Sequence, residues 1–203
     1  MALSTFDELK TGIANWLARA DLTSRIPEFI ALCEARFHRT LRLRSQEQRS
    51  TATTSSEYTE LPDSFLEARN FQVNGNPVTR LLPMSPQMMD SVYGGTTGRP
   101  EFFNIVGNEI QLAPAPDGSY EIEMDYYKKF DALSDSNVTN WLLTNSPDVY
   151  LFGSLAEATP FIRTTDSRIQ LWEAKYQAAI AELNRESDRA VYSGGAMQMR
   201  WAP

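Results

Sequence analysis

The chain has 203 residues, carries a net charge of −7 at neutral pH, and is 42% hydrophobic. A chain of this length can fold without a disulfide or a structural metal, and its single cysteine, Cys33, excludes an internal disulfide and a cysteine-based zinc site. The acidic balance argues against a protein that wraps nucleic acid, although an acidic wall can encircle DNA without gripping it. The sequence has no apolar run long enough to span a bilayer and no signal-peptide pattern at its start, so we expect assembly in the cytoplasm.

Two helices are predicted at the amino terminus. Ser4 or Thr5 is suited to cap the first of them. Apolar residues then recur at helical spacing, at Phe6, Leu9, Ile13, Trp16 and Leu17. A second apolar stripe follows, at Ile26, Phe29, Ile30, Cys33, Phe37 and Leu41. We expect the two helices to pair as a hairpin.

The pattern changes near Ser45, and residues 46–139 are predicted to form an inserted β-rich lobe. The dipeptide Asn74-Gly75 is typical of a two-residue hairpin turn. A short helix is expected at Pro86, with Ser85 as its cap. A second hairpin is expected around Gly107-Asn108, because apolar and polar residues alternate on both sides of it.

The clearest strand in the sequence is residues 120–127. Its apolar residues alternate with Glu121, Glu123 and Asp125, and this strict alternation predicts a sheet with one face in water. We interpret the three carboxylates as an acidic surface that faces a channel or a neighbouring subunit. They could also bind a cation or act as acid and base.

Helical spacing returns after Asn140, with one helix opened by Pro147 and a longer one that ends near Arg189. The predicted fold class is therefore α+β and mainly α. We expect an antiparallel helical bundle from both chain ends with an inserted antiparallel β-rich lobe and an extended C-terminal tail. The expected bounds are residues 1–45 and 140–189 for the bundle, 46–139 for the lobe and 190–203 for the tail.

Few side chains are candidates for catalysis. His38 is surrounded by arginines, which favours a solvated helix face over a general base, and Cys33 falls on an apolar stripe, which favours the core. The run Gly94–Gly98 is not followed by the Gly-Lys-Ser/Thr of a P-loop, so we interpret it as a surface loop. We predict a protein that is not an enzyme and has no catalytic, cofactor-binding or metal-binding residues.

A run of arginines interrupts the acidic balance at Arg36, Arg39, Arg42 and Arg44. These side chains could contact nucleic acid, pair with the acidic face of a neighbouring subunit, or form an ordinary solvated helix face. Of the three interpretations, we adopt as our hypothesis the contact with an acidic surface of the next subunit.

The last residues of the chain contain large side chains without a helical pattern. They are Tyr192, Met197, Met199, Arg200 and Trp201. Trp and Arg are common anchors of protein interfaces and Met adapts to irregular pockets, which indicates a docking segment. Terminal segments are also commonly disordered, so the two interpretations stand side by side.

The carboxy-terminal third resembles a known family. The segment from Leu142 to Ala158, the segment from Trp172 to Ile180, and Tyr192-Ser193-Gly194-Gly195 are similar to the head-to-tail adaptor (connector) proteins of short-tailed double-stranded DNA phages, the group that includes tail tubular protein A. The helix that begins Phe6-Asp7-Glu8-Leu9 fits the same layout.

The resemblance implies a homo-oligomeric ring, typically dodecameric, below the portal of the capsid. Its expected partners are other copies of the chain, the portal protein, a tail nozzle or fibre protein, and DNA that passes without specific binding. No cofactor and no membrane are implied, and the expected location is the virion neck after assembly in the host cytoplasm. The alternatives are a head-completion plug, a fibre connector, or an enzyme that uses the acidic sheet face.

Overall fold

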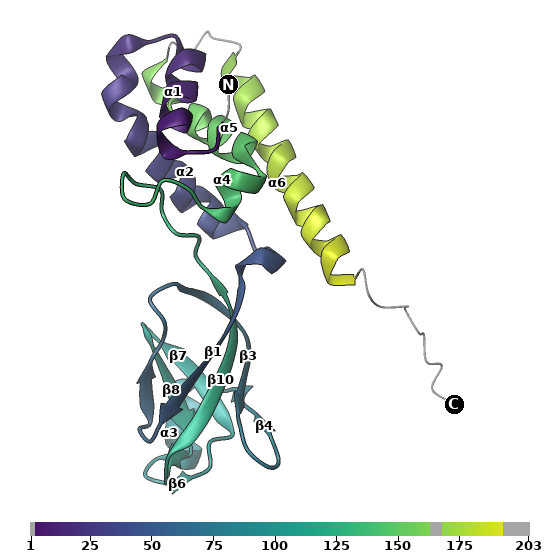
Figure 1. Ribbon diagram of the computed structural model, residues 1–203. Coiled ribbons are helices and arrows are strands. Elements are labelled where there is room, and N and C mark those ends of the chain that lie inside the picture. Colours follow the sequence, from purple (N-terminus) through teal and green to yellow (C-terminus); the bar gives the residue numbers. More distant parts are fainter. Residues whose placement is uncertain (1–2, 163–167, 193–203) are drawn as a thin grey trace. The chain divides into compact units, whose positions relative to one another are not determined.

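The structure is a computed structural model that describes residues 3–162 and 168–192. The chain divides into two compact units (Figure 1). Unit 1 comprises the residues up to Ser45 and those from Phe130 onward, and unit 2 is the continuous segment Gln46–Lys129. Each unit has an apolar core of its own.

Unit 1 is helical. Its helices are α1 (Phe6–Leu17), α2 (Ile26–Thr40), α4 (Trp141–Asn145), α5 (Pro147–Glu157) and α6 (Arg168–Tyr192). Short 3-10 helices lie at Ala20–Arg25 and Thr159–Phe161, and a third, Arg44–Gln46, lies at the boundary with unit 2. The expected cap of α1 is confirmed, because Thr5 and Glu8 form a reciprocal capping box.

Helix α5 lies at the centre of unit 1 and packs against α1, α2, α4 and α6. Gly153 permits this close approach, since a Cβ atom there would collide with Sγ of Cys33 on α2 and lie 2.9 Å from the ring of Tyr176 on α6. The apolar stripes predicted for α1 and α2 face this core except at Trp16, which is 47% exposed. Helix α6 contributes Trp172, Tyr176, Ala179, Ile180 and Leu183 to the same core, whereas Ile169 at its start is only half-buried.

Unit 2 contains ten strands and one helix. The longer strands are β1 (Glu47–Thr54), β3 (Phe65–Val73), β7 (Phe102–Val106), β8 (Glu109–Ala113) and β10 (Tyr120–Lys128). The shorter ones are β2 (Tyr58–Glu60), β4 (Thr79–Arg80), β5 (Leu82–Pro83), β6 (Thr97–Gly98) and β9 (Ala115–Pro116). The helix is α3 (Pro86–Tyr93).

The strands of unit 2 form three sheets, in the orders β1-β10-β3-β4, β2-β8-β7-β5 and β6-β9. The two larger sheets contribute side chains to one core, in which Phe71 and Ile122 from the first sheet join Ile110 and Leu112 from the second. The hairpin expected at Gly107-Asn108 is confirmed as the connection between β7 and β8.

The connection at Asn74-Gly75 is longer than a two-residue turn. Val73 pairs with Thr79, so five residues lie between the strands. Pro77 stands in this connection and has no backbone N–H to donate, so it cannot extend the ladder of β4.

The expected fold class, a mainly α antiparallel bundle with an inserted antiparallel lobe, is wrong. The protein is an α+β structure in which the β unit has three sheets, and two of them contain parallel pairs, β5 with β7 and β6 with β9. Each of these pairs involves a strand of only two residues, and so short a strand has no alternation that a sequence pattern could reveal. Helix α6 continues through Tyr192, and residues 193–203 lie outside the described residues.

Candidate protein-interaction surfaces

The four arginines Arg36, Arg39, Arg42 and Arg44 fall into two groups, and the first group, Arg36 and Arg42, binds groups within unit 1. Arg36 on α2 forms salt bridges with Glu157 on α5 and Glu173 on α6, where Nη1 lies 3.0 Å from Oε2 of Glu173 and 3.3 Å from Oε1 of Glu157. Its guanidinium also lies 4.4 Å from the ring centre of Tyr176. Hydrogen bonding to Arg36 holds the pKa of Glu173 below its usual value. Arg42 donates to the carbonyl oxygens at the end of α2, including that of His38 at 2.9 Å.

Arg39 and Arg44 differ from this pair. Both residues are exposed, and within residues 3–162 and 168–192 neither side chain has a hydrogen bond or an ion pair. The backbone N–H of Arg44 donates to Oγ of Ser187 at 2.9 Å, which joins the start of the 3-10 helix Arg44–Gln46 to α6 without using the guanidinium. The two cations are therefore available for contacts with another molecule.

The carboxylates of β10 lie in a polar network with a mixture of charges. β1 pairs with β10 and places Arg49 opposite Asp125, where Nη2 of Arg49 lies 2.5 Å from Oε2 of Glu123. Asn74 donates to Glu121 at 2.6 Å and to Glu123 at 3.2 Å. Hydrogen bonding to Arg49 is the main cause that lowers the pKa of Glu123, and Glu123 is only 8% exposed. Glu121 and Asp125 are the more accessible members of the predicted acidic face.

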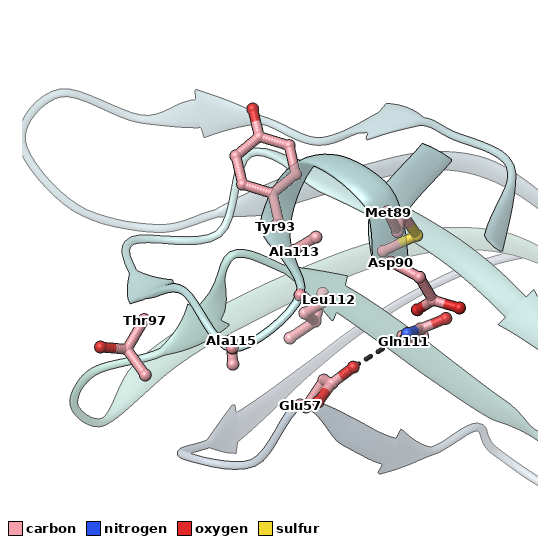
Figure 2. A pocket seen from close by; sticks show the side chains of 11 residues that line it. Glu57, Met89, Asp90, Tyr93, Thr97, Gln111, Leu112, Ala113 and Ala115 are labelled. Carbon is pink, nitrogen blue, oxygen red and sulfur yellow. Dashed lines mark hydrogen bonds between the residues drawn. The ribbon is translucent and has the colours of Figure 1, made fainter. Parts of the chain in front are cut away.

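A small pocket of about 110 Å³ opens in unit 2 between α3, the turn that follows it, and strands β8 and β9 (Figure 2). Gln111 on β8 is 4% exposed, and its Nε2 donates to Oε1 of Glu57 at 2.8 Å. Asp90 on α3 also lines the pocket (Figure 2). We call this the Glu57–Asp90 pocket. Sequence reasoning missed it because its polar residues come from three separate segments and no local motif joins them.

Unit 1 carries an exposed aromatic patch. Trp16 on α1 stands edge-on to Phe152 on α5, with ring centres 5.7 Å apart. Nζ of Lys175 on α6 lies 5.2 Å from the centre of the Phe152 ring, and Leu171 is half exposed one turn earlier on the same helix. The sequence pattern assigned Trp16 to the core, but it is typical of an interface residue in this setting.

Cys33, His38 and the Gly94–Gly98 run were the candidates for catalysis or phosphate binding in the sequence. Cys33 is fully buried, as expected, its thiol donates to the carbonyl oxygen of Val149 at 3.7 Å, and burial raises the pKa of that thiol. His38 is half-buried and stands edge-on to the ring of Phe37. Gly94-Gly95 forms the turn beside the Glu57–Asp90 pocket. The described part of the chain has no group of three side chains suited to bind a metal, and none of its helices is both long and apolar enough to cross a membrane.

The predicted docking residues belong to the carboxy-terminal end of the chain. Met197, Met199, Arg200 and Trp201 lie outside the described residues, and Tyr192 is described only as the last residue of α6.

The chain thus has a helical unit and a β unit with separate cores, and it exposes charged and aromatic side chains of the kind that protein interfaces use. The SU10 adaptor protein family matches residues 4–200 of the sequence. The chain belongs to this family of phage adaptor proteins. Membership implies a structural component of the virion that binds other virion components. No curated protein matches the sequence.

Proposed function

We propose that the protein is a head-to-tail adaptor whose copies form a ring, dodecameric as in the tail tubular protein A group, between the portal of the capsid and the tail. The observation that carries this proposal is the adaptor family match over residues 4–200. The ring would surround the channel through which the genome leaves the capsid. Its partners would be the portal protein above and a nozzle or fibre protein below.

Self-association has a physical basis in the charges of the two units. Arg39 and Arg44 on unit 1 are exposed and unpaired within the described residues, and Glu121 and Asp125 on unit 2 are accessible carboxylates. A contact between two different patches is repeated around a ring when the rotation closes. Many modest contacts then add up to a stable assembly.

The exposed patch of Trp16, Phe152, Leu171 and Lys175 supports the same proposal. Large aromatic side chains at the centre of an interface contribute more to binding than most of their neighbours. We assign this patch to contacts with other virion proteins or with a second copy.

Docking to the portal is assigned to the carboxy-terminal residues Tyr192, Met197, Met199, Arg200 and Trp201. Trp and Arg side chains are common anchors of protein interfaces, and Met adapts to irregular pockets, which supports a docking role for this segment. DNA would pass without being held, because a chain with a net charge of −7 offers little net attraction to phosphates.

Electron microscopy of the purified protein, alone and mixed with isolated portal, tests this function. We expect rings that stack on the portal. A variant that ends at Tyr192 keeps all of α6, and we expect it to form the ring but to lose portal binding. Unchanged portal binding by this variant would rule out the tail as the docking segment. A protein that stays monomeric and does not bind capsid proteins would rule out the adaptor function. Binding only to fibre proteins would identify a fibre connector. Binding only to an already completed neck would identify a head-completion plug.

A further inference from the structure

Helix α2 has an outer side that unit 1 leaves exposed. Its buried residues are Ile26, Phe29, Ile30, Cys33, Glu34 and Phe37. The opposite side of the helix carries Glu28, Leu32, Ala35 and Arg39. These four residues follow one another at helical spacing, so they form one line along the helix axis, which we call the α2 stripe. All four are exposed, and Leu32 is 52% exposed.

The two ends of the α2 stripe carry opposite charges. Glu28 lies in the first turn of α2 and Arg39 in its last turn. Within residues 3–162 and 168–192, neither side chain forms a hydrogen bond or an ion pair. By contrast, Arg36 is held by Glu173 and Glu157 on the flank of the same helix. The stripe therefore offers one free acid, two apolar side chains and one free base, in that order.

This order makes the α2 stripe complementary to a copy of itself. Two antiparallel α2 helices can be related by a twofold axis that passes midway between residues 33 and 34. In this register Glu28 of each helix faces Arg39 of the other. The same register places Leu32 of each helix opposite Ala35 of the other. A single arrangement thus satisfies both the charged and the apolar positions, and the twofold axis repeats each pair.

The packing of such a helix pair is favourable. The small side chain of Ala35 leaves room for Leu32 of the opposite helix, which allows the close approach that helix packing requires. The charged residues are about 16 Å apart along each helix, so the two ion pairs flank the apolar centre. Apolar contacts that exclude water strengthen neighbouring ion pairs. The dipoles of antiparallel helices also place opposite ends side by side.

We propose that the α2 stripe binds the α2 stripe of a second copy in an antiparallel, twofold contact. The partner is identified by the self-complementary charges of Glu28 and Arg39. Such a contact is isologous and closes after two copies, so it yields a dimer and not a ring. The ring contact proposed above also uses Arg39. A chain in the dimer therefore cannot offer this side chain to the ring, and the dimer has to open when the ring forms.

The contact is small, because each copy contributes one side of one helix. Interfaces of this size form weak and reversible complexes. We expect the full wild-type chain to show a monomer–dimer equilibrium in sedimentation velocity, with dimers that dissociate on dilution. A chain without dimers at any accessible concentration would overturn the proposal.

Charge reversal at the two ends of the stripe tests the pairing. Glu28→Arg leaves two cations on the stripe and Arg39→Glu leaves two carboxylates, so each variant places like charges opposite each other twice. We expect each to weaken dimerisation at least about tenfold. The double variant Glu28→Arg/Arg39→Glu should restore the dimer, and an equimolar mixture of the two single variants should form mixed dimers more readily than either variant alone. Dimerisation that is unchanged by the single variants would overturn the pairing.

Glu182→Arg is the matched control, because Glu182 is exposed on α6, another helix of unit 1. We expect this variant to dimerise like the wild type. Loss of the dimer in Glu182→Arg, without rescue in the mixture of the Glu28 and Arg39 variants, would assign the contact to α6 and overturn the α2 pair. All three substituted residues are exposed, so thermal unfolding of each variant should stay close to that of the wild type.

Cross-linking detects the twofold contact directly. In the proposed register Ala35 lies close to Ala35 of the second copy, so a chain with Ala35→Cys alone should form a covalent dimer with a short bis-maleimide linker. The native Cys33 is fully buried and does not compete. Ala178→Cys, at an exposed position of α6, is the control and should give little product. A product that forms only when the two variants are mixed would contradict the twofold contact. None of these outcomes depends on the adaptor function, which binding to the portal tests separately.

Discussion

The hydroxyl of Tyr150 and the backbone N–H of Leu133 donate to the same oxygen of Glu34, Oε1, at 3.0 and 2.9 Å. Asn140, the N-cap of α4, donates to the Tyr150 hydroxyl at 2.6 Å. This buried network joins α2 to α5 and to the segment that precedes α4. The stability of unit 1 should therefore depend on the protonation of the Glu34 carboxyl.

Burial raises the pKa of Glu34 above 4.5, against the opposing hydrogen bonds from Leu133 and Tyr150. The folded chain therefore holds this proton more tightly than the unfolded chain does. The resulting stabilisation is fully present below pH 4.5 and is lost as the pH rises through the raised folded pKa. Glu34→Gln keeps an Oε1 acceptor for both donors, so we expect it to remove this decline and to be at least as stable as the wild type at neutral pH.

Urea unfolding between pH 4 and pH 8 measures this difference. Glu28→Gln is the matched control, because Glu28 is exposed in the first turn of the same helix. Parallel pH profiles for Glu34→Gln and the wild type would show that Glu34 is not the group responsible.

Gly153 and Cys33 should be energetically coupled. Gly153→Ala places a methyl group against Sγ of Cys33 and the Tyr176 ring, so we expect a loss of about 1–3 kcal/mol in the free energy of unfolding. Cys33→Ala removes the sulfur and should recover part of this loss in the double variant. Gly118→Ala meets nothing within 4 Å and should have little effect. A double-mutant cycle with no coupling would contradict the packing described for α5.

Arg36 and Arg39 should differ in their effect on stability although they are only three positions apart on α2. The single ammonium group of a lysine cannot replace the guanidinium that binds Glu173 and Glu157 at the same time. We therefore expect Arg36→Lys to lower the free energy of unfolding by about 1 kcal/mol, and by less at high salt because salt screens the ion pairs. Arg39→Lys should leave the stability of the monomer unchanged. Thermal unfolding at low and high salt distinguishes them, and equal losses would be inconsistent with the contacts of Arg36.

Trp16 should become protected on assembly. At 47% exposure it is open to a quencher such as iodide in the free chain, whereas Trp172 is 1% exposed and shielded in every state. We expect a Trp16→Phe chain to show less quenching than the wild type as a monomer. The two should converge when rings or mixed complexes form. Quenching of Trp16 that is unchanged by assembly would exclude its patch from every interface formed.

The spacing of apolar residues was sufficient to predict a helix where only one face of the helix packs against the core. The spacing of apolar residues predicted α1, α2 and α6, and Ser85-Pro86 predicted α3. Helix α5 is apolar on most sides because it is surrounded by other helices, so its spacing could not show which neighbour each residue faces.

Long-range pairing explains what the sequence could not reveal. The three carboxylates of β10 were predicted as one acidic face, but the register with β1 brings Arg49 to Glu123 and leaves Glu121 and Asp125 more accessible. The Glu57–Asp90 pocket is assembled from a loop, a helix and a strand far apart in the chain. No pattern of neighbouring residues records such an arrangement.

Unit 1 is built from two chain segments that unit 2 separates in the sequence, and this order determines when its core can form during synthesis on the ribosome. Cys33 and its partner Val149 are 116 positions apart, so the first two helices leave the exit tunnel long before the helix that covers them exists. The intervening segment is continuous and can complete its own core meanwhile. The nascent chain therefore carries uncovered apolar helices for much of translation. This interval is when a chaperone would be needed most, and it is set by the length of the insertion.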